Sequence, residues 1–184
     1  MIFEFIADRP ALDFVATVAE RGTNNVDLLR SPADLVDWVR QSGIIDRDLR
    51  ATEADLKRAK VLREALFALV AALINGSLPR DLERKIVNAA AGWPRPLLEL
   101  DAFGHVHRSG GLNAVLAVLA TDVIDLYRGP DRGLIRWCDD ARCTRPFVDR
   151  SRGHRRRWCG MQGCGDRAKA AAYRQRQRAA NISN

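Results

Sequence analysis

Four cysteines, arranged as two matched pairs, limit what this sequence can fold into more than any other feature. The first pair is Cys138 and Cys143, the second is Cys159 and Cys164, and four residues separate the members of each pair. The chain contains no other cysteine. The matched spacing favours one shared site, which each pair would reach through a tight turn. Gly163, beside the last cysteine, supplies backbone freedom for the second turn.

The cellular location expected for the chain favours a bound metal ion over two disulfides. Residues 1–7 have no basic segment ahead of their short apolar run, so no signal peptide is expected. No apolar run approaches the roughly 20 residues that span a bilayer, so no membrane segment is expected. A cytoplasmic location, where thiols stay reduced, is therefore predicted. Four thiolates then suit a closed, tetrahedral, structural zinc site.

Spacing alone leaves other interpretations of the cysteines open. An iron–sulfur cluster also takes four cysteine ligands, although the spacing is not ferredoxin-like. Free buried cysteines are disfavoured because the same dipeptide, Trp137-Cys138 and Trp158-Cys159, begins both pairs. We expect the two tryptophans to pack over the metal as an apolar shell.

The charge of the chain is concentrated around the cysteines. The formal net charge is +7, from 30 Lys and Arg against 23 Asp and Glu. Residues 131–184 hold 14 of the cations and 5 of the acids, which leaves 16 and 18 for residues 1–130. This asymmetry indicates a polyanionic partner for the C-terminal part. A solvated basic tail is the alternative interpretation.

Residues 1–130 read as a mostly helical region with a few short strands. Apolar residues recur at three- and four-residue intervals behind helix-start signals such as Ser31-Pro32 and Thr52. The predicted helices begin near Pro10, Ser31, Thr52, Pro79 and Leu112, and the first runs to Ala19. Extended segments are predicted at residues 2–6 and, as a β-hairpin, at 97–100 and 105–108.

Nothing in residues 1–130 points to catalysis. The region has no phosphate-binding glycine loop, nucleophile elbow or telling pair of carboxylates, and four thiolates would leave a metal no position for a reactive water. An enzyme is therefore not expected. His105 and His107 would share one face of a strand and could bind a metal, but ordinary surface histidines are the simpler interpretation.

Residues 131–184 read as a treble-clef-like zinc finger. Strands are predicted at 145–149 and 155–158, joined by a turn at 151–154, and Asp166 is placed to cap a C-terminal helix. So small a module has little apolar core, and metal binding, worth on the order of 10–16 kcal/mol in zinc peptides, would be needed to fold it. The predicted fold class is α+β, mostly α-helical.

The residues also carry a family resemblance. Residues 145–159 and 164–174 resemble the CGNR zinc finger, and residues 11–15, 27–38, 62–65 and 122–126 are similar to parts of the ABATE domain that precedes it. The resemblance implies a bacterial stress-responsive transcription regulator. Residues 1–130 would be its sensing or ligand-binding domain, and residues 131–184 its zinc-bound, DNA-binding finger.

One position departs from the family pattern, because the Asn of the CGNR motif is Asp166 in this chain. As a helix cap, Asp serves as well as Asn. In a contact with a DNA base, Asp would not replace Asn, since Asn forms paired hydrogen bonds with adenine whereas Asp can only accept a hydrogen bond. The exchange favours a structural role for this position, or else a shifted sequence preference.

Basic side chains on both sides of the second cysteine pair are the candidate contacts to nucleic acid. The predicted cationic surface consists of Arg155, Arg156, Arg157, Arg167, Lys169, Arg174 and Arg178. One of the three consecutive arginines is expected to point inward, because strand neighbours alternate faces. RNA and an acidic protein partner are the alternatives to DNA. A homodimer would suit a two-fold DNA site, although no heptad seam is present, and the ligand of residues 1–130 is unknown.

Overall fold

The structure is a computed structural model, and it describes residues 2–182 of the chain. The helices are α1 (Pro10–Val15), α2 (Pro32–Ser42), α3 (Glu53–Ile74), α4 (Asp81–Ala91), α5 (Leu112–Arg128) and α6 (Asp166–Ile182). The strands are β1 (Val18–Ala19), β2 (Val26–Asp27), β3 (Leu97–Leu100), β4 (Val106–Ser109), β5 (Ile135–Trp137) and β6 (Pro146–Val148), paired in sequence order as antiparallel hairpins. The predicted α+β, mostly helical fold class is confirmed.

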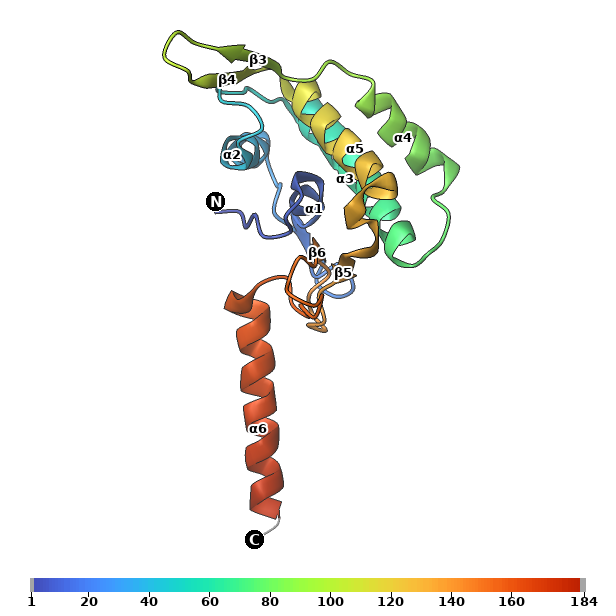
Figure 1. Cartoon of the computed structure of the whole chain (residues 1–184), viewed down its shortest axis with the longest axis vertical. Coiled ribbons are helices and arrows are strands. Elements are labelled where there is room, and N and C mark those ends of the chain that lie inside the picture. Colours follow the sequence, from blue (N-terminus) through green and yellow to red (C-terminus); the bar gives the residue numbers. More distant parts are fainter. Residues whose placement is uncertain (1, 183–184) are drawn as a thin grey trace.

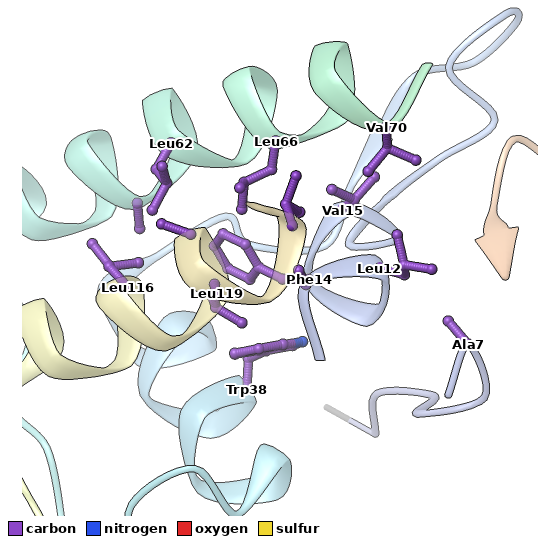
Figure 2. Close-up of a cluster of buried hydrophobic side chains, with 14 of the residues drawn as sticks. Ala7, Leu12, Phe14, Val15, Trp38, Leu62, Leu66, Val70, Leu116 and Leu119 are labelled. Carbon is purple, nitrogen blue, oxygen red and sulfur yellow. The ribbon is translucent and has the colours of Figure 1, made fainter. Parts of the chain in front are cut away.

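The core lies where α1 and α2 meet the long helices α3 and α5. Figure 2 shows Phe14 of α1 among leucines of α3 and α5, with Trp38 of α2 beneath it. The rings of Phe14 and Trp38 are 4.8 Å apart between centroids and meet edge to face. Helix α4 packs outside α3 and α5. Trp38 is therefore a core residue, as its place in an amphipathic pattern indicates.

The predicted starts of α2 and α3 are confirmed in atomic detail. The Ser31 hydroxyl accepts a hydrogen bond from the Asp34 amide, and the Asp34 carboxylate accepts one from the Ser31 amide. Thr52 and Asp55 form the same reciprocal pair at the start of α3. Each pair satisfies two backbone donors that a helix end would otherwise leave without partners.

Two predictions near the N-terminus are wrong. Residues 2–6 form no strand, because their amides bond to side chains: Phe3 donates to Gln41, and Ile6 donates to Asp13. The first helix ends at Val15, not at Ala19. The chain turns there into the β1–β2 hairpin, which brings Asp27 onto α3.

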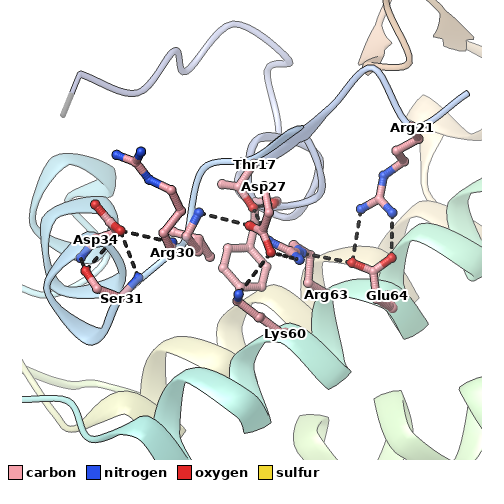
Figure 3. A network of polar contacts seen from close by, with 11 residues as sticks. Thr17, Arg21, Asp27, Arg30, Ser31, Asp34, Lys60, Arg63 and Glu64 are labelled. Carbon is pink, nitrogen blue, oxygen red and sulfur yellow. Dashed lines mark hydrogen bonds and ion pairs between the residues drawn. The ribbon is translucent and has the colours of Figure 1, made fainter. Parts of the chain in front are cut away.

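Asp27 holds a buried arginine of α3 in place (Figure 3). Arg63, only 3% exposed, donates to both carboxylate oxygens of Asp27, at 2.8 and 3.0 Å, and to the Thr17 hydroxyl at 3.1 Å. Burial acts to raise the pKa of Asp27, but hydrogen bonds from Arg63 and Lys60 outweigh it and hold the pKa at about 2. A buried guanidinium without this partner would be strongly destabilising.

The C-terminal hairpin differs from the predicted one. Strand β6 pairs with β5, in the register Ile135 opposite Val148, and residues 155–158 form no strand. The buried Asp149 carboxylate explains this, because it accepts amide hydrogen bonds from Ser151 and Arg156 and folds the chain back on itself. The Val148 amide also donates to the carbonyl of Ala7. The hairpin therefore adjoins the N-terminal segment.

The finger shares one hydrophobic core with the rest of the protein. Ile135, Phe147 and Val148 are buried in the same cluster as the residues of α1, α3 and α5. Helix α6, in contrast, extends away from the body (Figure 1), and its residues 166–178 are largely exposed. None of the helices described has the length and apolar character required to cross a membrane.

Candidate metal centre

The structure brings all four cysteines together. Cys138 directly follows β5, Cys143 lies in the loop before β6, Cys159 follows the segment that closes on Asp149, and Cys164 lies in the turn before α6. Their sulfur atoms all lie within 4.8 Å of one another, and within the described residues this is the group of His, Cys, Asp or Glu side chains that could hold a metal ion.

The sulfur spacing fits a tetrahedral thiolate site. The Cys159 sulfur lies 3.7 Å from that of Cys143 and 3.7 Å from that of Cys164. A tetrahedral zinc ion with Zn–S bonds of about 2.3 Å would hold its ligand sulfurs about 3.8 Å apart. Cys138, Cys159 and Cys164 are buried, and Cys143 is half-buried. The donor set therefore suits a closed structural site.

Local hydrogen bonds fix both cysteine turns. In the first, the Cys138 amide donates to the Arg145 carbonyl, and the Cys143 amide donates to that of Asp140, 2.8 Å away. In the second, Gly163 has φ of 86°, a left-handed conformation that L side chains rarely adopt. A Cβ on Gly165 would lie 3.0 Å from the Met161 sulfur, so the Met161 side chain would have to shift to admit it. The predicted glycine requirement is thus visible in the geometry.

Ionisation of one thiol opposes ionisation of its neighbours in the cysteine group. Hydrogen bonds from Cys143 and Cys159 lower the pKa of Cys138, so this thiol ionises first. Burial, followed by the charge of neighbouring thiolates, then raises the pKa of Cys164 to about 12. A divalent cation removes this repulsion. Arg167 supplies part of the compensating charge, since its guanidinium donates to the Cys164 sulfur at 3.0 Å.

The two tryptophans beside the cysteines have different neighbours. The ring of Trp137 lies 5.7 Å from the ring of Phe67 on α3. Trp158 is half-buried, and the guanidinium of Arg157 lies 5.3 Å from its ring. Trp137 therefore connects the metal centre to α3. That both rings cover the metal remains a prediction.

Of the three consecutive arginines, Arg156 is the one that points inward. Its guanidinium donates to the carbonyls of Trp158, Ile6 and Cys159 and lies 4.5 Å from the centre of the buried Phe147 ring. Arg155 and Arg157 are exposed. The expectation that one of the three points inward is thus met by Arg156, which leaves Arg155 and Arg157 to face solvent.

Two of the predicted basic residues also tie the cysteine loops together. Arg157 donates to Asp139 and Arg167 donates to Asp140, both at 2.7 Å. These ion pairs connect the first loop to the second cysteine pair. Both arginines remain partly exposed, at 66% and 43%, so each keeps donors on the surface.

A basic groove of about 650 Å³ runs between the first cysteine loop and α6. Its cations are Arg142, Arg157, Arg167, Lys169 and Arg174, and its acids are Asp139 and Asp140; Ala141, Trp158, Ala168, Ala171, Ala172 and Gln175 complete the lining. Arg142 is absent from the sequence-based set. Its position between the two cysteines of the first pair, in an exposed loop, is the signal that could have identified it.

The remaining predicted residues lie on or near α6. Lys169, Arg174 and Arg178 are exposed, and Arg155 and Arg178 lie outside the groove. Asp166 has helical backbone angles, φ −69° and ψ −38°, so it lies inside the first turn and is not the predicted N-cap. Its carboxylate is 3.9 Å from the Lys169 ammonium.

His105 and His107 do share one side of the β3–β4 hairpin. Nδ1 of His105 and Nε2 of His107 each lie 3.1 Å from the same carboxylate oxygen of Asp101. Both side chains are exposed, and they belong to no larger group of ligating residues in the described part of the chain. The simpler interpretation, surface histidines on a hairpin, fits this geometry.

Comparison with known families accounts for most of the chain. Residues 8–130 match the ABATE family, described as "Putative stress-induced transcription regulator". Residues 135–177 match the CGNR zinc finger. A search of curated proteins gave no match.

Proposed function

The chain belongs to the ABATE family and carries a CGNR zinc finger, and from this we propose that it is a stress-responsive transcription regulator that binds DNA through its finger. In this proposal residues 131–184 form the DNA-binding part, and residues 1–130 form the part that senses a signal. The four cysteines hold a zinc ion, which fixes the two loops that flank the basic groove. Both descriptions name a regulator or a binding module, not an enzyme.

The basic groove is the observation that carries this proposal. Five cations and two acids line it, and both acids already pair with groove arginines. The groove therefore keeps a net positive charge, which attracts a phosphate backbone. Arg142 and Arg174, on opposite walls, have no side-chain partner in the described residues, so their guanidinium groups are available for phosphates.

Helix α6 supplies a reading element of the right shape. It extends away from the body with its basic side chains exposed (Figure 1). An α-helix of about 10–12 Å diameter fits the major groove of B-form DNA, which is about 12 Å wide. The major groove of A-form RNA is deep and narrow. A projecting helix therefore favours duplex DNA over duplex RNA.

A salt titration tests the proposal. Binding of duplex DNA, single-stranded DNA and structured RNA would be measured by fluorescence anisotropy between 50 and 200 mM salt. With five phosphate contacts, log affinity for duplex DNA should fall with log salt at a slope of about −4.5. Arg142→Ala and Arg174→Ala should each flatten the slope by about 0.9, while Arg47→Ala, an exposed cation on the N-terminal half, should leave it unchanged.

The titration also decides between the proposed partners. Stronger binding of single strands or structured RNA would identify RNA as the ligand. A salt-insensitive interaction with all three would overturn the phosphate model. In that case a zinc-stabilised module for an acidic protein would explain the groove, and charge reversal at Arg142 and Arg174 should abolish that partner while zinc stays bound.

For the sensing part, we propose the groove between α3 and α4. It has a volume of about 1020 Å³, and its lining combines alanines such as Ala68 and apolar residues such as Ile86 with charged residues such as Lys60. Phe67 lines it and contacts Trp137, next to the first cysteine. A ligand that moves Phe67 would therefore act directly on the metal centre.

A spectroscopic experiment tests this route. Dodecanoate, an amphipathic anion, would be titrated while tryptophan fluorescence and hydrogen exchange of residues 135–143 are followed. Binding should change both signals, and Ala68→Trp, which fills the groove, should abolish the change. Trp137→Ala removes the contact with Phe67 and leaves the groove lining intact, so it should preserve binding but uncouple it from residues 135–143. Unchanged exchange at saturating dodecanoate would count against the route.

A further inference from the structure

We propose that two copies of this chain associate through the outer edge of β3, the strand at the end of the molecule opposite to α6. The β3–β4 hairpin projects from the body (Figure 1), and DNA binding through the basic groove makes no use of it. The argument rests on its exposed side chains, its free backbone groups and the symmetry of antiparallel pairing.

The hairpin exposes an unusual amount of apolar surface. Leu97, Leu98, Leu100, Phe103 and Val106 are exposed by 61, 66, 73, 86 and 53%. The pairing of Leu100 with Val106 and of Leu98 with Arg108 places Leu98, Leu100 and Val106 on one face. Large contiguous apolar patches on a protein surface mark interaction sites, so this group of exposed apolar side chains indicates an interface.

The backbone of β3 is free along its outer edge. On β4, the Arg108 amide and carbonyl both bond to Asp46, so they point away from β3. Leu98, opposite Arg108, must therefore direct its own amide and carbonyl outward, and so must Leu100 two residues on. No hydrogen bond within the described part of the chain satisfies these groups on β3.

An isolated hairpin with such an edge needs another strand. A two-stranded hairpin is marginally stable in water, and natural proteins protect exposed edges with charges, proline or a covering segment. The loop at Asp46 covers the edge of β4. Along β3, only Glu99 carries charge. Pro96 precedes β3 and limits this edge at its start, so the edge from Leu97 to Leu100 is the one that accepts a partner strand.

A second copy fits this edge because antiparallel pairing about Leu98 is self-complementary. The amide and carbonyl of each Leu98 would bond to those of the other copy, which generates a two-fold axis at this residue. Glu99 would then lie opposite Leu97 of the second copy, so the two carboxylates avoid each other.

Sedimentation equilibrium of the full-length, metal-loaded protein tests the proposal. Wild type should be a dimer that dissociates on dilution. Leu98→Lys should raise the dimer dissociation constant by about 100-fold or more, since it places two ammonium groups at the axis. Leu98→Pro removes only the outward amide and should also weaken the dimer. The matched control, Leu78→Lys, changes a leucine that is 91% exposed away from the hairpin and should remain dimeric.

Several outcomes would overturn the proposal. If the wild-type protein is monomeric at several hundred micromolar, the edge of β3 does not bind a second copy. Binding of a different protein at this edge would likewise contradict the proposed dimer. A dimer that survives both Leu98 variants forms elsewhere, and open-ended oligomers contradict a two-fold axis. Circular dichroism melts would show that the variants stay folded. DNA affinity is measured in a separate experiment, so the dimer proposal and the DNA-binding proposal can each fail without the other.

Discussion

The guanidinium of Arg156 lies 4.5 Å from the centre of the fully buried Phe147 ring and donates a hydrogen bond to the carbonyl of Ile6, 150 residues earlier in the chain. One side chain thus joins the cysteine segment, the hairpin and the N-terminal segment. An arginine within a basic run, which composition assigns to nucleic acid, is instead a structural element of the fold.

Replacement of Arg156 should therefore reduce stability rather than the number of DNA contacts. Arg156→Ala leaves the partly buried carbonyls of Ile6, Trp158 and Cys159 without this donor, and we expect the free energy of unfolding to fall by about 2 kcal/mol. The salt slope of DNA binding should stay at the wild-type value. Arg155→Ala, the exposed neighbour, is the control for stability. A flattened slope with wild-type stability in Arg156→Ala would contradict this assignment.

Removal of the metal should destabilise the whole protein and not only the finger. Ile135, Phe147 and Val148 belong to the common core, so the loss of the loops that flank them weakens its packing. We expect chelation to lower the melting temperature of the helical signal at 222 nm in one transition. Cys143→Ser should do the same without a chelator. If the helices of residues 1–130 melt at the same temperature with and without metal, the two parts are independent.

Asp13 should make stability depend on pH in a direction unusual for a carboxylate. Burial raises its pKa to about 6, although the amides of Ile6 and Ala7 donate to it and act in the opposite direction. Because the folded pKa lies above the unfolded value of 3.8, the protonated group stabilises the fold below pH 4. This contribution is lost as pH rises to 6.

Asp13→Asn isolates this effect. The difference in the free energy of unfolding between variant and wild type should shift in favour of Asn by about 3 kcal/mol from pH 4 to pH 7. Chemical denaturation at a series of pH values, with metal held saturating, measures it. A difference that stays constant with pH would show that the pKa of Asp13 is not raised.

Asp166, where this chain departs from the family motif, should be of little consequence for folding. It is exposed within the first turn of α6. We expect Asp166→Asn to change stability by no more than about 0.5 kcal/mol and to leave zinc stoichiometry at one per chain. DNA affinity should rise, because one negative charge beside the basic groove is removed. Lost zinc in this variant would assign the position a role in the metal centre.

Local sequence patterns determined the elements whose causes lie within a few residues. The reciprocal caps at Ser31 and Thr52, the amphipathic stripe of α3 and the hairpin at residues 97–109 all follow from neighbours at short spacing. The convergence of the four cysteines on one site could equally be predicted from the sequence. Two matched cysteine pairs with equal internal spacing indicate one shared site.

Only the tertiary structure decided which distant segments meet. The partner of β6 is β5 and not residues 155–158, Arg156 points inward to Ile6, and Arg142 joins the basic groove. Such choices depend on which buried carbonyls and carboxylates need donors after the chain has packed. For Arg156 and Ile6 that requirement joins residues 150 positions apart, and no local periodicity or spacing records it.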